Sequence, residues 1–580
     1  MVERVGGVVL AKNAEIARAL KELALLVEIE GKEKYAARAY KRAVRSITSL
    51  GEDIEAVANR EELESIPGIG KGISKKIRRY LETGSIPLLE RLRARIPVKV
   101  MVLDSIPGVG PKTIALLYHE LGVTDLDSLE KAARDGKIAL LKGMGKKTET
   151  QIIEGIDLVR SGLDRTLLAD AMSVVETIRQ KIQNVDGVNQ VVIAGSYRRR
   201  RETVGDLDFL VDADDPELVM EAFSTLDNVQ DVLVKGPTKT AVRLKSSLQM
   251  DLRVIPTESF GAGLQYFTGS VDHNVRLRGI ARSMGLKLNE YGLYRDEELV
   301  AGEREEDIYE SLGLAWITPE LRENHGEIDA VKNGTLPHLV KLDDIRGDLH
   351  SHTDQSDGSN TIEEMLDAAA EREHEYFCVS DHTQSLTIAN GMDEERLLER
   401  IEEIDTLNTS GKWDMMILKG AEVDILADGT LDITDDVLAQ LDVVTVSVHS
   451  RMKDSKKVMT ERVCTALENK HVHLLGHPTG RLIGKRAEFE IDLEPVFEVA
   501  KKNQVAMELN ANPYRLDLNP GNLRAAINMD LKIAINTDAH KVSELDYMKF
   551  GIFQARRGWI TKSDVLNTMA LKDLQKWLKK

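Results

Sequence analysis

Three aspartates in the middle of the chain have the types and spacing of a divalent-metal site. Asp206 and Asp208 lie two residues apart in GDLDFLV, so on a β-strand both carboxylates would point from the same face of a sheet. Asp251, in the strand-like segment QMDLRVIP, is a candidate third acid from a neighbouring strand. Paired carboxylates are poor core residues but good Mg²⁺ ligands, and three of them can hold two ions for phosphoryl transfer.

The residues just before this pair add phosphate-binding features. Gly195 and Ser196 end an apolar run in a tight turn, and Gly205 directly precedes Asp206. Between them stand four consecutive arginines, of which Arg199 could neutralise charge that develops on a triphosphate. An isolated Asp-x-Asp pair is more often a solvated strand edge, but this combination favours a nucleotide site.

A second group of candidate metal ligands lies in the C-terminal half, where nine of the 13 histidines follow residue 345. His350 and His352 are two residues apart on one expected strand. Six histidines and three acids in all stand at the ends of strand-like apolar runs: His350, His352, Asp357, His382, Glu422, His449, His477, Asp538 and His540. The carboxyl ends of strands converge in a β/α barrel, so ligands far apart in sequence can meet. Mixed histidine and carboxylate ligation favours Mn²⁺, Zn²⁺ or Fe²⁺, and nine ligands are enough for two or three ions with Glu422 as the bridge. His374, His471 and His473 lack this context, and we expect them to be structural.

Three similar glycine-containing segments lie upstream of both groups: ESIPGIGKGISKKI (64–77), DSIPGVGPKTIALL (104–117) and ALLKGMGKKTETQII (139–153). Their glycine pairs are Gly68 and Gly70, Gly108 and Gly110, and Gly143 and Gly145. A glycine turn between two helices presents backbone N–H groups to a phosphate oxygen. A single copy could be a plain hairpin, whereas three copies favour helix-hairpin-helix motifs that bind the DNA backbone without sequence preference.

The elements expected around these residues fall into blocks. Residues 9–60 have the periodicity of amphipathic helices. From about residue 166, a mixed sheet is predicted from strand-like segments at 188–196, 206–212, 230–236, 240–245 and 248–256, with a helix at 216–226. A helical segment at 268–285 and a strand-like segment at 286–295 follow. The glycine, proline and mixed charge of residues 325–344 indicate a linker, and the repeated strand–helix pattern beyond it predicts a barrel.

Composition bounds the class of protein. The 580-residue chain has 42% hydrophobic residues, a net charge of -18 and no run of about 18 apolar residues. The N-terminal segment MVERVGGVVLAKNAE lacks a signal-peptide pattern, and the only cysteines, Cys378 and Cys464, exclude a disulfide framework or a thiolate zinc site. The acidic charge does not exclude nucleic acid, because residues 1–160 carry 28 Lys and Arg against 23 Asp and Glu. We therefore expect a cytoplasmic protein with no membrane segment.

From about residue 10 to 335, the chain resembles the family X DNA polymerases, the DNA polymerase beta group. The segments that carry the resemblance are GSYRRRRETVGDLDFLV, MDLRVIP, LQYFTGSVDHNVRLRGIA and LNEYGLY. The resemblance implies that Asp206, Asp208 and Asp251 bind Mg²⁺ or Mn²⁺ in the palm. It implies nucleotide contacts from Gly195, Ser196, Arg199, Gly205, Tyr266, Phe267, Gly269 and Asn274, and DNA contacts from Arg253 and Arg278.

Two positions qualify this resemblance. The family often has an acidic residue directly after TGS, where this chain has Val271. Lys76 falls where some members carry the Schiff-base lysine of a deoxyribose-phosphate lyase, but a lysine that only contacts phosphate would fit the sequence slightly better.

Residues 346–580 resemble the polymerase and histidinol phosphatase (PHP) domain, a distorted (β/α)₇ barrel. Every metal-ligand motif of that domain is present, which implies an active metal-dependent phosphoesterase. The expected fold is therefore multidomain: helical helix-hairpin-helix regions, an α+β nucleotidyltransferase palm and thumb, and the barrel. We expect a lyase-like helix-hairpin-helix domain at 1–95, fingers at 96–165, the palm at 166–260, the thumb at 261–325, a linker at 326–345 and the PHP domain at 346–580.

The expected function is a monomeric, gap-filling DNA polymerase of base-excision repair that uses dNTPs and gapped or primed duplex DNA. Its PHP domain would act as a 3′-5′ exonuclease or process 3′ ends or abasic sites. The sequence leaves three alternatives open. The chain could be mainly a metal-dependent nuclease or phosphatase with weak polymerisation, a DNA-end-binding scaffold without catalysis, or a template-independent nucleotidyltransferase.

Overall fold

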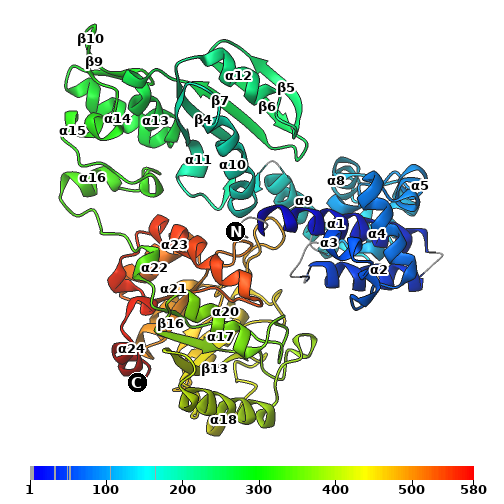
Figure 1. Cartoon of the computed structure of the whole chain (residues 1–580). Coiled ribbons are helices and arrows are strands. Elements are labelled where there is room, and N and C mark those ends of the chain that lie inside the picture. The colour runs from blue at the N-terminus through cyan, green and yellow to red at the C-terminus, as the bar shows by residue number, and fades with distance from the viewer. Residues whose placement is uncertain are drawn as a thin grey trace. The chain divides into compact units, whose positions relative to one another are not determined.

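The computed structural model of the chain describes residues 6–31, 34–48, 50, 54–104, 106, 108–163 and 165–579. Residues 1–5, part of the stretch considered for a signal peptide, lie outside the described residues. The chain divides into two compact units, one up to Leu163 together with Gly484–Arg486, and the other comprising Asp164–Ile483 and Ala487–Lys580 (Figure 1). In the described ranges, no helix has both the length and the apolar character needed to cross a membrane.

The first unit is helical. Its helices are α1 (Gly6–Glu30), α2 (Lys34–Thr48), α3 (Ile54–Asn59), α4 (Lys71–Thr83), α5 (Pro87–Arg95), α6 (Val100–Leu103), α7 (Pro111–Leu121), α8 (Leu126–Arg134) and α9 (Lys146–Leu163). Aliphatic side chains of α1, such as Leu20 and Leu23, are fully buried in its core. The aliphatic composition of α1 therefore reflects its central place, since a helix packed on several sides needs apolar residues around most of its circumference.

The first glycine of each of the three segments has the same backbone conformation. Gly68, Gly108 and Gly143 have φ values of 84°, 83° and 85°, in the left-handed region that favours glycine. Three residues later the second helix of each hairpin begins, as α4, α7 and α9. The repeat seen in the sequence is therefore a repeat of structure, and helix-hairpin-helix motifs are confirmed.

The palm is a five-stranded sheet in the order β2-β4-β7-β6-β5. Its strands are β2 (Val188–Ile193), β4 (Asp206–Ala213), β5 (Val229–Lys235), β6 (Lys239–Leu244) and β7 (Gln249–Val254), with β4 and β7 parallel. Helices α10 (Leu168–Gln183) and α12 (Pro216–Ser224) share a hydrophobic core with Leu207, Phe209 and Val211 of β4. Because side chains alternate along a strand, Asp206 and Asp208 point to the opposite face, away from both helices.

One local prediction in the palm is wrong. Strand β2 ends at Ile193, and Gly195 and Ser196, expected to end that strand in a tight turn, begin the short helix α11 (Gly195–Arg198). A two-stranded ribbon of β1 (Thr166–Leu167) and β3 (Thr203–Val204) then returns the chain to β4. The arginine run therefore lies in and after a helical turn between β2 and β3.

The thumb combines helices with a three-stranded antiparallel sheet. Its elements are α13 (Phe260–Thr268), α14 (Val271–Ser283), β8 (Lys287–Asn289), β9 (Gly292–Arg295), β10 (Glu298–Ala301), α15 (Glu305–Ser311) and α16 (Glu327–Lys332). The expected linker is thus not a simple extended connection, because it contains α16. Ile328 of this helix is buried in the thumb core, and Val340 is buried in the core of the C-terminal domain. The segment was predicted to be a linker because of its glycine, proline and charged residues, although it also contains these apolar residues.

The C-terminal domain is a parallel sheet in the sequential order β11 to β17. The strands are β11 (Gly347–Asp348), β12 (Tyr376–Val379), β13 (Met416–Asp424), β14 (Val443–Ser447), β15 (Leu474–Leu475), β16 (Ala506–Asn510) and β17 (Ile533–Asn536). A parallel bridge between Ser351 and Ala539 links the segments that follow the first and last strands, which nearly closes the barrel.

Helices surround this barrel: α17 (Ile362–Glu371), α18 (Glu394–Ser410), α19 (Asp435–Leu438), α20 (Lys456–Leu467), α21 (Leu493–Lys502), α22 (Pro520–Asn528), α23 (Met548–Arg557) and α24 (Leu571–Leu578). The expected barrel is confirmed, with one correction. Strand β11 has only two residues, so His350 and His352 lie just beyond it and not on the strand.

Candidate active sites

The three palm aspartates lie on one face of the sheet. Strands β4 and β7 are parallel neighbours in which Asp208 pairs with Asp251 and Asp206 with Gln249. Residues opposite each other in this register project from the same face. Burial, followed by the charges of Asp206 and Asp251, raises the pKa of Asp208 to about 7. Mutual repulsion among three carboxylates on one face is the electrostatic pattern of an acid cluster suited to divalent cations.

Two neighbours hold Asp251. The Lys239 Nζ lies 3.0 Å from one carboxylate oxygen of Asp251, and the Gln249 side-chain amide donates to the other at 2.9 Å. Sequence reasoning did not single out Lys239, although it stands at the start of the adjacent strand β6. A cation that binds Asp251 must compete with this ammonium group, so Lys239 neutralises the third acid when the cluster is free of metal.

A cavity of about 470 Å³ opens in front of the acids. It is lined by Arg165, Gly195, Ser196, Arg199, Arg201, Asp206, Asp208, Tyr266, Phe267, Gly269, Ser270, Val271, Asn274 and Arg278. Most of the residues expected to contact a nucleotide are therefore gathered around one space, although Gly205 and Asp251 are not in its lining. Gly195 is required by close approach, because a Cβ there would lie 2.5 Å from an Asp208 carboxylate oxygen.

Side chains in the cavity wall are held by further contacts. Asn274 donates to the Tyr266 carbonyl and accepts from the Gln265 amide, each at 2.7 Å. The Arg253 guanidinium lies 4.7 Å from the centre of the Phe267 ring. Arg278 donates to the Asn274 carbonyl at 3.4 Å. The segment from Tyr266 to Asn274 is thus fixed from several sides, as a surface that selects a ligand by shape requires.

Lys76 lies on α4, in the first helix-hairpin-helix motif. Its Nζ donates to the Gly72 carbonyl at 3.2 Å and lies 5.6 Å from the centre of the Tyr40 ring. The side chain thus stays at the N-terminal end of α4, beside the glycine turn, where it can add positive charge to the backbone N–H groups of that turn.

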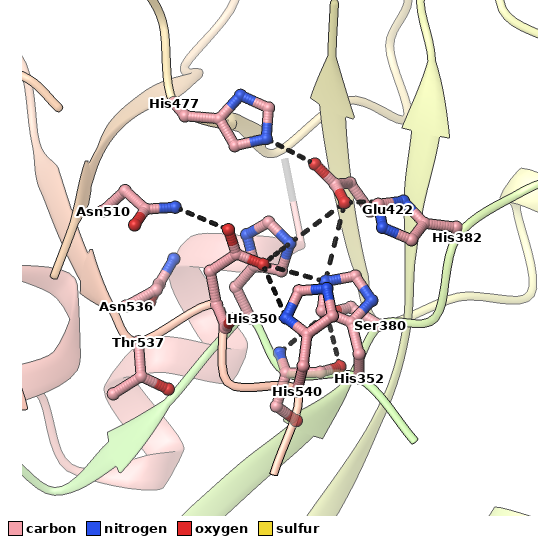
Figure 2. Close-up of polar contacts among 12 residues, drawn as sticks. His350, His352, Ser380, His382, Glu422, His477, Asn510, Asn536, Thr537 and His540 are labelled. Carbon is pink, nitrogen blue, oxygen red and sulfur yellow. Dashed lines mark hydrogen bonds and ion pairs between the residues drawn. The ribbon is translucent and has the colours of Figure 1, made fainter. Parts of the chain in front are cut away.

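The expected ligands of the C-terminal domain converge at the carboxyl end of the barrel (Figure 2). Three groups have ligand atoms close enough to share a cation: His352, Asp357, His382 and His540; His350, His352, Glu422 and Asp538; and His382, Glu422 and His449. His477 lies outside these groups, but its Nε2 is 2.9 Å from a Glu422 oxygen. All nine residues therefore meet around one centre, although 190 positions separate the first from the last.

Glu422 occupies the middle of the cluster. Its carboxylate lies 2.9 Å from the His382 ring, 3.4 Å from His350 and His449, and 3.6 Å from His352. Burial alone would raise the pKa of Glu422, but the neighbouring histidines, led by His382, hold it well below its usual range. A fully ionised, buried carboxylate shared among five histidines is the arrangement expected of a bridging ligand.

The donor set fits divalent cations. Among the described residues, several of these buried atoms lack a hydrogen-bond partner of good geometry, namely His350 Nε2, His352 Nδ1 and Nε2, His382 Nδ1, His477 Nδ1 and both Glu422 oxygens. Buried polar atoms are normally satisfied, and bound cations would satisfy these. Burial, followed by the charges of His540 and His382, lowers the pKa of His352 to about 4, so its ring is neutral and able to donate a lone pair.

Comparison with known families agrees with this geometry. The chain matches the family models of the DNA polymerase beta palm over 169–271, the DNA polymerase beta thumb over 263–323 and the PHP domain over 348–512. It also matches a helix-hairpin-helix domain over 11–86 and a SAM-like helix-hairpin-helix tandem over 100–157. A Bacillus subtilis protein named DNA polymerase/3′-5′ exonuclease PolX is 39% identical over 98% of this chain and 99% of its own length. The chain belongs to the family X DNA polymerases.

More distant relatives match only part of this family X chain. DNA polymerase lambda of Rattus norvegicus is 26% identical over 54% of the chain and 56% of its own length. DNA polymerase lambda of Arabidopsis thaliana is 25% identical over 49% of the chain and 57% of its own length. Of these three relatives, the Bacillus protein matches nearly the whole of this chain, whereas each lambda polymerase matches about half of it.

Sequence reasoning missed two buried acids beside the PHP cluster of this polymerase. Glu508, in the middle of β16, lies 2.7 Å from His350 Nδ1, and Asp424 lies 3.3 Å from His449 Nδ1. A carboxylate on one ring nitrogen fixes the tautomer and leaves the other nitrogen for a metal. The sequence does contain a signal for Glu508, because this acid lies in the strand-like run VAMELNA, and the predicted ligands are also associated with strand-like runs.

One of the three histidines expected to be structural has a clear structural contact. His473 Nδ1 accepts from the Val444 N–H, and its Nε2 lies 3.0 Å from the Leu578 carbonyl oxygen. Both ring nitrogens are thus occupied by the backbone, in agreement with a role in packing the barrel.

Proposed function

We propose that the chain is a template-directed DNA polymerase that fills short gaps in DNA repair, with a 3′-5′ exonuclease in its PHP domain. The observation that carries the polymerase part is the register of β4 and β7, which sets Asp251 beside Asp208 on the face that borders the nucleotide-sized cavity. We also propose that residues 166–325 perform polymerisation, residues 346–580 perform hydrolysis, and the helix-hairpin-helix regions at 1–165 hold the DNA.

In the palm, Asp206, Asp208 and Asp251 would hold Mg²⁺ or Mn²⁺, which when bound activates the primer 3′-hydroxyl and stabilises the triphosphate. The cavity arginines Arg165 and Arg199 would neutralise the phosphates. Sequence reasoning did not single out Arg165, which precedes β1 and has no motif around it. Tyr266 and Phe267 would border the sugar, where a fixed wall can exclude a ribose 2′-hydroxyl.

In the PHP domain, the nine ligands would hold two or three Mn²⁺, Zn²⁺ or Fe²⁺ ions, which when bound supply an activated water and grip the phosphodiester. Glu422 would bridge them from the centre of the cluster. Glu508 and Asp424 would keep the rings of His350 and His449 in the required tautomers. Arg515 Nε, 3.8 Å from the Asp538 carboxylate, is placed to meet a substrate phosphate at the edge of the cluster.

The test of this function uses one gapped duplex and one 5′-labelled single strand. We expect dNTP incorporation that follows the template base, and stepwise shortening of the labelled strand from its 3′ end. Incorporation that ignores the template would favour a template-independent nucleotidyltransferase. Tight DNA binding without turnover of either substrate would favour a scaffold, and digestion without extension would favour a nuclease.

The state in which the enzyme works is also part of the proposal. We infer that the chain acts as a monomer, because the proposed substrate-binding and metal-binding groups all come from one chain. We place it in the cytoplasm, with the DNA that it would repair. Its cysteines, Cys378 and Cys464, are both free thiols.

Lowering the pH from 8 to 6 is expected to reduce the apparent Mg²⁺ affinity of the palm about tenfold. The pKa of Asp208 is raised to about 7, so below that pH a cation must displace a proton, whereas above it the carboxylate is already ionised. The measurement is the Mg²⁺ concentration that gives half-maximal extension at pH 6, 7 and 8. Most of the shift should fall between pH 6 and 7, and equal values at those two pHs would contradict the assignment.

Replacing Lys146 and Lys147 together by alanine is expected to weaken DNA binding equally for all sequences. Both lysines are exposed at the start of α9, directly after the Gly143 and Gly145 turn. For each phosphate that is no longer neutralised, the slope of log affinity against log salt should fall by about 0.9. Fluorescence anisotropy at several salt concentrations measures this slope. Lys137→Ala, which removes a lysine paired with Asp135 at 3.0 Å, is the control and should leave the slope unchanged.

We propose that Lys76 contacts a DNA phosphate beside the first glycine turn. The hydrogen bond from its Nζ to the Gly72 carbonyl keeps the charge at that turn. Borohydride trapping of a covalent adduct between Lys76 and a 5′-deoxyribose phosphate would overturn this assignment in favour of a lyase.

A further inference from the structure

The run of four arginines is not a solvated loop, because each guanidinium has protein partners. Arg198 makes a two-point contact with Glu305 of the thumb, at 2.8 and 2.9 Å. Arg199 donates to Glu323 Oε1 at 3.1 Å and to the Thr268 carbonyl. These hydrogen bonds join the arginine run to the thumb, so the thumb helps to fix the position of the loop.

A helix of the PHP domain lies behind this loop. Arg557, the last residue of α23, donates from one nitrogen to the Arg199 carbonyl at 2.8 Å and to Glu323 at 3.1 Å. One turn earlier, the Phe553 ring lies 4.5 Å from the Arg200 guanidinium. The next residue of the loop after the run, Glu202, accepts from Arg481 of the PHP domain at 2.7 Å. The PHP domain therefore contacts three successive parts of the loop, at Arg199, Arg200 and Glu202.

The charges at this interface are unequal. Glu323 is only 11% exposed, and it faces Arg199 and Arg557 at 3.1 Å and Arg201 at 3.6 Å. One carboxylate opposite three guanidinium groups leaves net positive charge, and two of the three, Arg199 and Arg201, line the cavity in front of the acids. Burial alone would raise the pKa of Glu323, but these arginines, led by Arg199, hold it below its usual value.

Removing Arg557 would change this balance. Glu323 would then form ion pairs only with the cavity arginines, Arg199 and Arg201. Their positive charge would be neutralised more fully by this carboxylate, so their attraction for a triphosphate would be weaker. The Arg199 carbonyl would also have no donor from α23. Both effects act on the arginines and leave the three aspartates untouched.

We propose that Arg557, a residue of the PHP domain, is a positioning residue for the triphosphate-binding arginines of the polymerase domain. The proposal rests on the proposed function of the palm. It explains why an acidic chain concentrates four arginines in this loop: some face the cavity, and others anchor the loop to the thumb and to the PHP domain. The phosphoesterase domain thereby becomes part of the structure that binds the incoming nucleotide.

The test is Arg557→Met in the full chain, which keeps the buried aliphatic stem and removes the charge and the donors. We expect the KM for dNTP in gap filling to rise about tenfold, because a charge-assisted hydrogen bond is removed, while kcat falls less than about threefold. Digestion of single-stranded DNA from the 3′ end should be unchanged, which reports a folded PHP domain. An unchanged KM overturns the proposal.

Arg556→Met is the matched control, since Arg556 lies on the same helix but donates to Glu320, Thr318 and the Val340 carbonyl. An equal rise in KM for both variants would mean that loosening the domain interface is sufficient, and it would overturn the specific role of Arg557. Should Arg557→Met fail to fold, Phe553→Leu tests the same loop through another side chain, with an expected rise in KM of about threefold.

A double substitution separates charge balance from packing. Adding Glu323→Gln to Arg557→Met removes the carboxylate that would otherwise capture Arg199, so we expect the KM to recover at least about threefold. No recovery would overturn the electrostatic part of the proposal. Extension by the unaltered chain decides the proposed function independently: if it extends primers and Arg557→Met has a normal KM, only the positioning role fails.

Discussion

Asp208→Asn is expected to lower the rate of primer extension at least about 10²–10³-fold while leaving 3′-5′ digestion intact. The substitution keeps the shape of the side chain and removes the negative charge nearest to both other acids. Asp208 pairs with Asp251 across β4 and β7 and has a pKa of about 7. Single-nucleotide incorporation into a gapped duplex measures the loss of rate, with digestion of a labelled single strand in parallel.

The same variant is expected to make the metal-free protein more stable at pH 8. The folded pKa of Asp208, about 7, lies above its unfolded value of about 3.9, so ionisation lowers stability as pH rises between these values and the loss is complete above pH 7. Removing the charge should therefore raise the Tm, by about 2–4 °C for each kcal/mol relieved. Asp231→Asn, on the exposed strand β5, should change neither extension nor Tm. Extension that survives Asp208→Asn would refute the palm assignment.

The parts of the fold that could be predicted have short-range causes. Alternation along GDLDFLV places Asp206 and Asp208 on one face of any strand, whatever its neighbours are. The glycines at 68, 108 and 143 predict turns, because glycine is the residue type that readily adopts a φ near 84°. The barrel ligands were predictable as a set because parallel strands of a barrel end on the same side.

The parts that escaped prediction depend on partners far along the chain. Nothing near Arg199 indicates that its carbonyl accepts from Arg557, 358 positions away. Glu508 stands in a strand-like run, but its contact with His350, 158 positions away, is not visible in the local sequence. Ile328 and Val340 were assigned to a linker because they are buried in two different cores. The hydrophobic residues of this segment therefore show no regular helical or strand spacing in the sequence. Tertiary contacts, and not local propensity, determine the structural role of each of these residues.

Glu422→Gln is expected to reduce 3′-5′ digestion at least about 100-fold and to leave gap filling at the level of the unaltered chain. Removing a residue that only supports a metal ligand costs about 10–100-fold, and Glu422 is itself the central proposed ligand. Its carboxylate lies within 3.6 Å of five histidine rings. Metal analysis after dialysis should show fewer ions per chain, a readout that does not depend on turnover.

The charge change also predicts a pH-dependent loss of stability without metal. Burial would lower the pKa of His449, but Glu422 and Asp424 raise it to about 10, so the protonated ring stabilises the fold at neutral pH and this contribution disappears only as pH rises through about 10. With glutamine in place of Glu422, that contribution shrinks, and the Tm of the metal-free variant should fall at pH 7. Glu461→Gln, an exposed residue of α20, is the control and should keep digestion, metal content and Tm. If Glu422→Gln retains both its metal and its digestion, the bridge lies elsewhere, and the five histidines do not share the arrangement that their distances to Glu422 indicate.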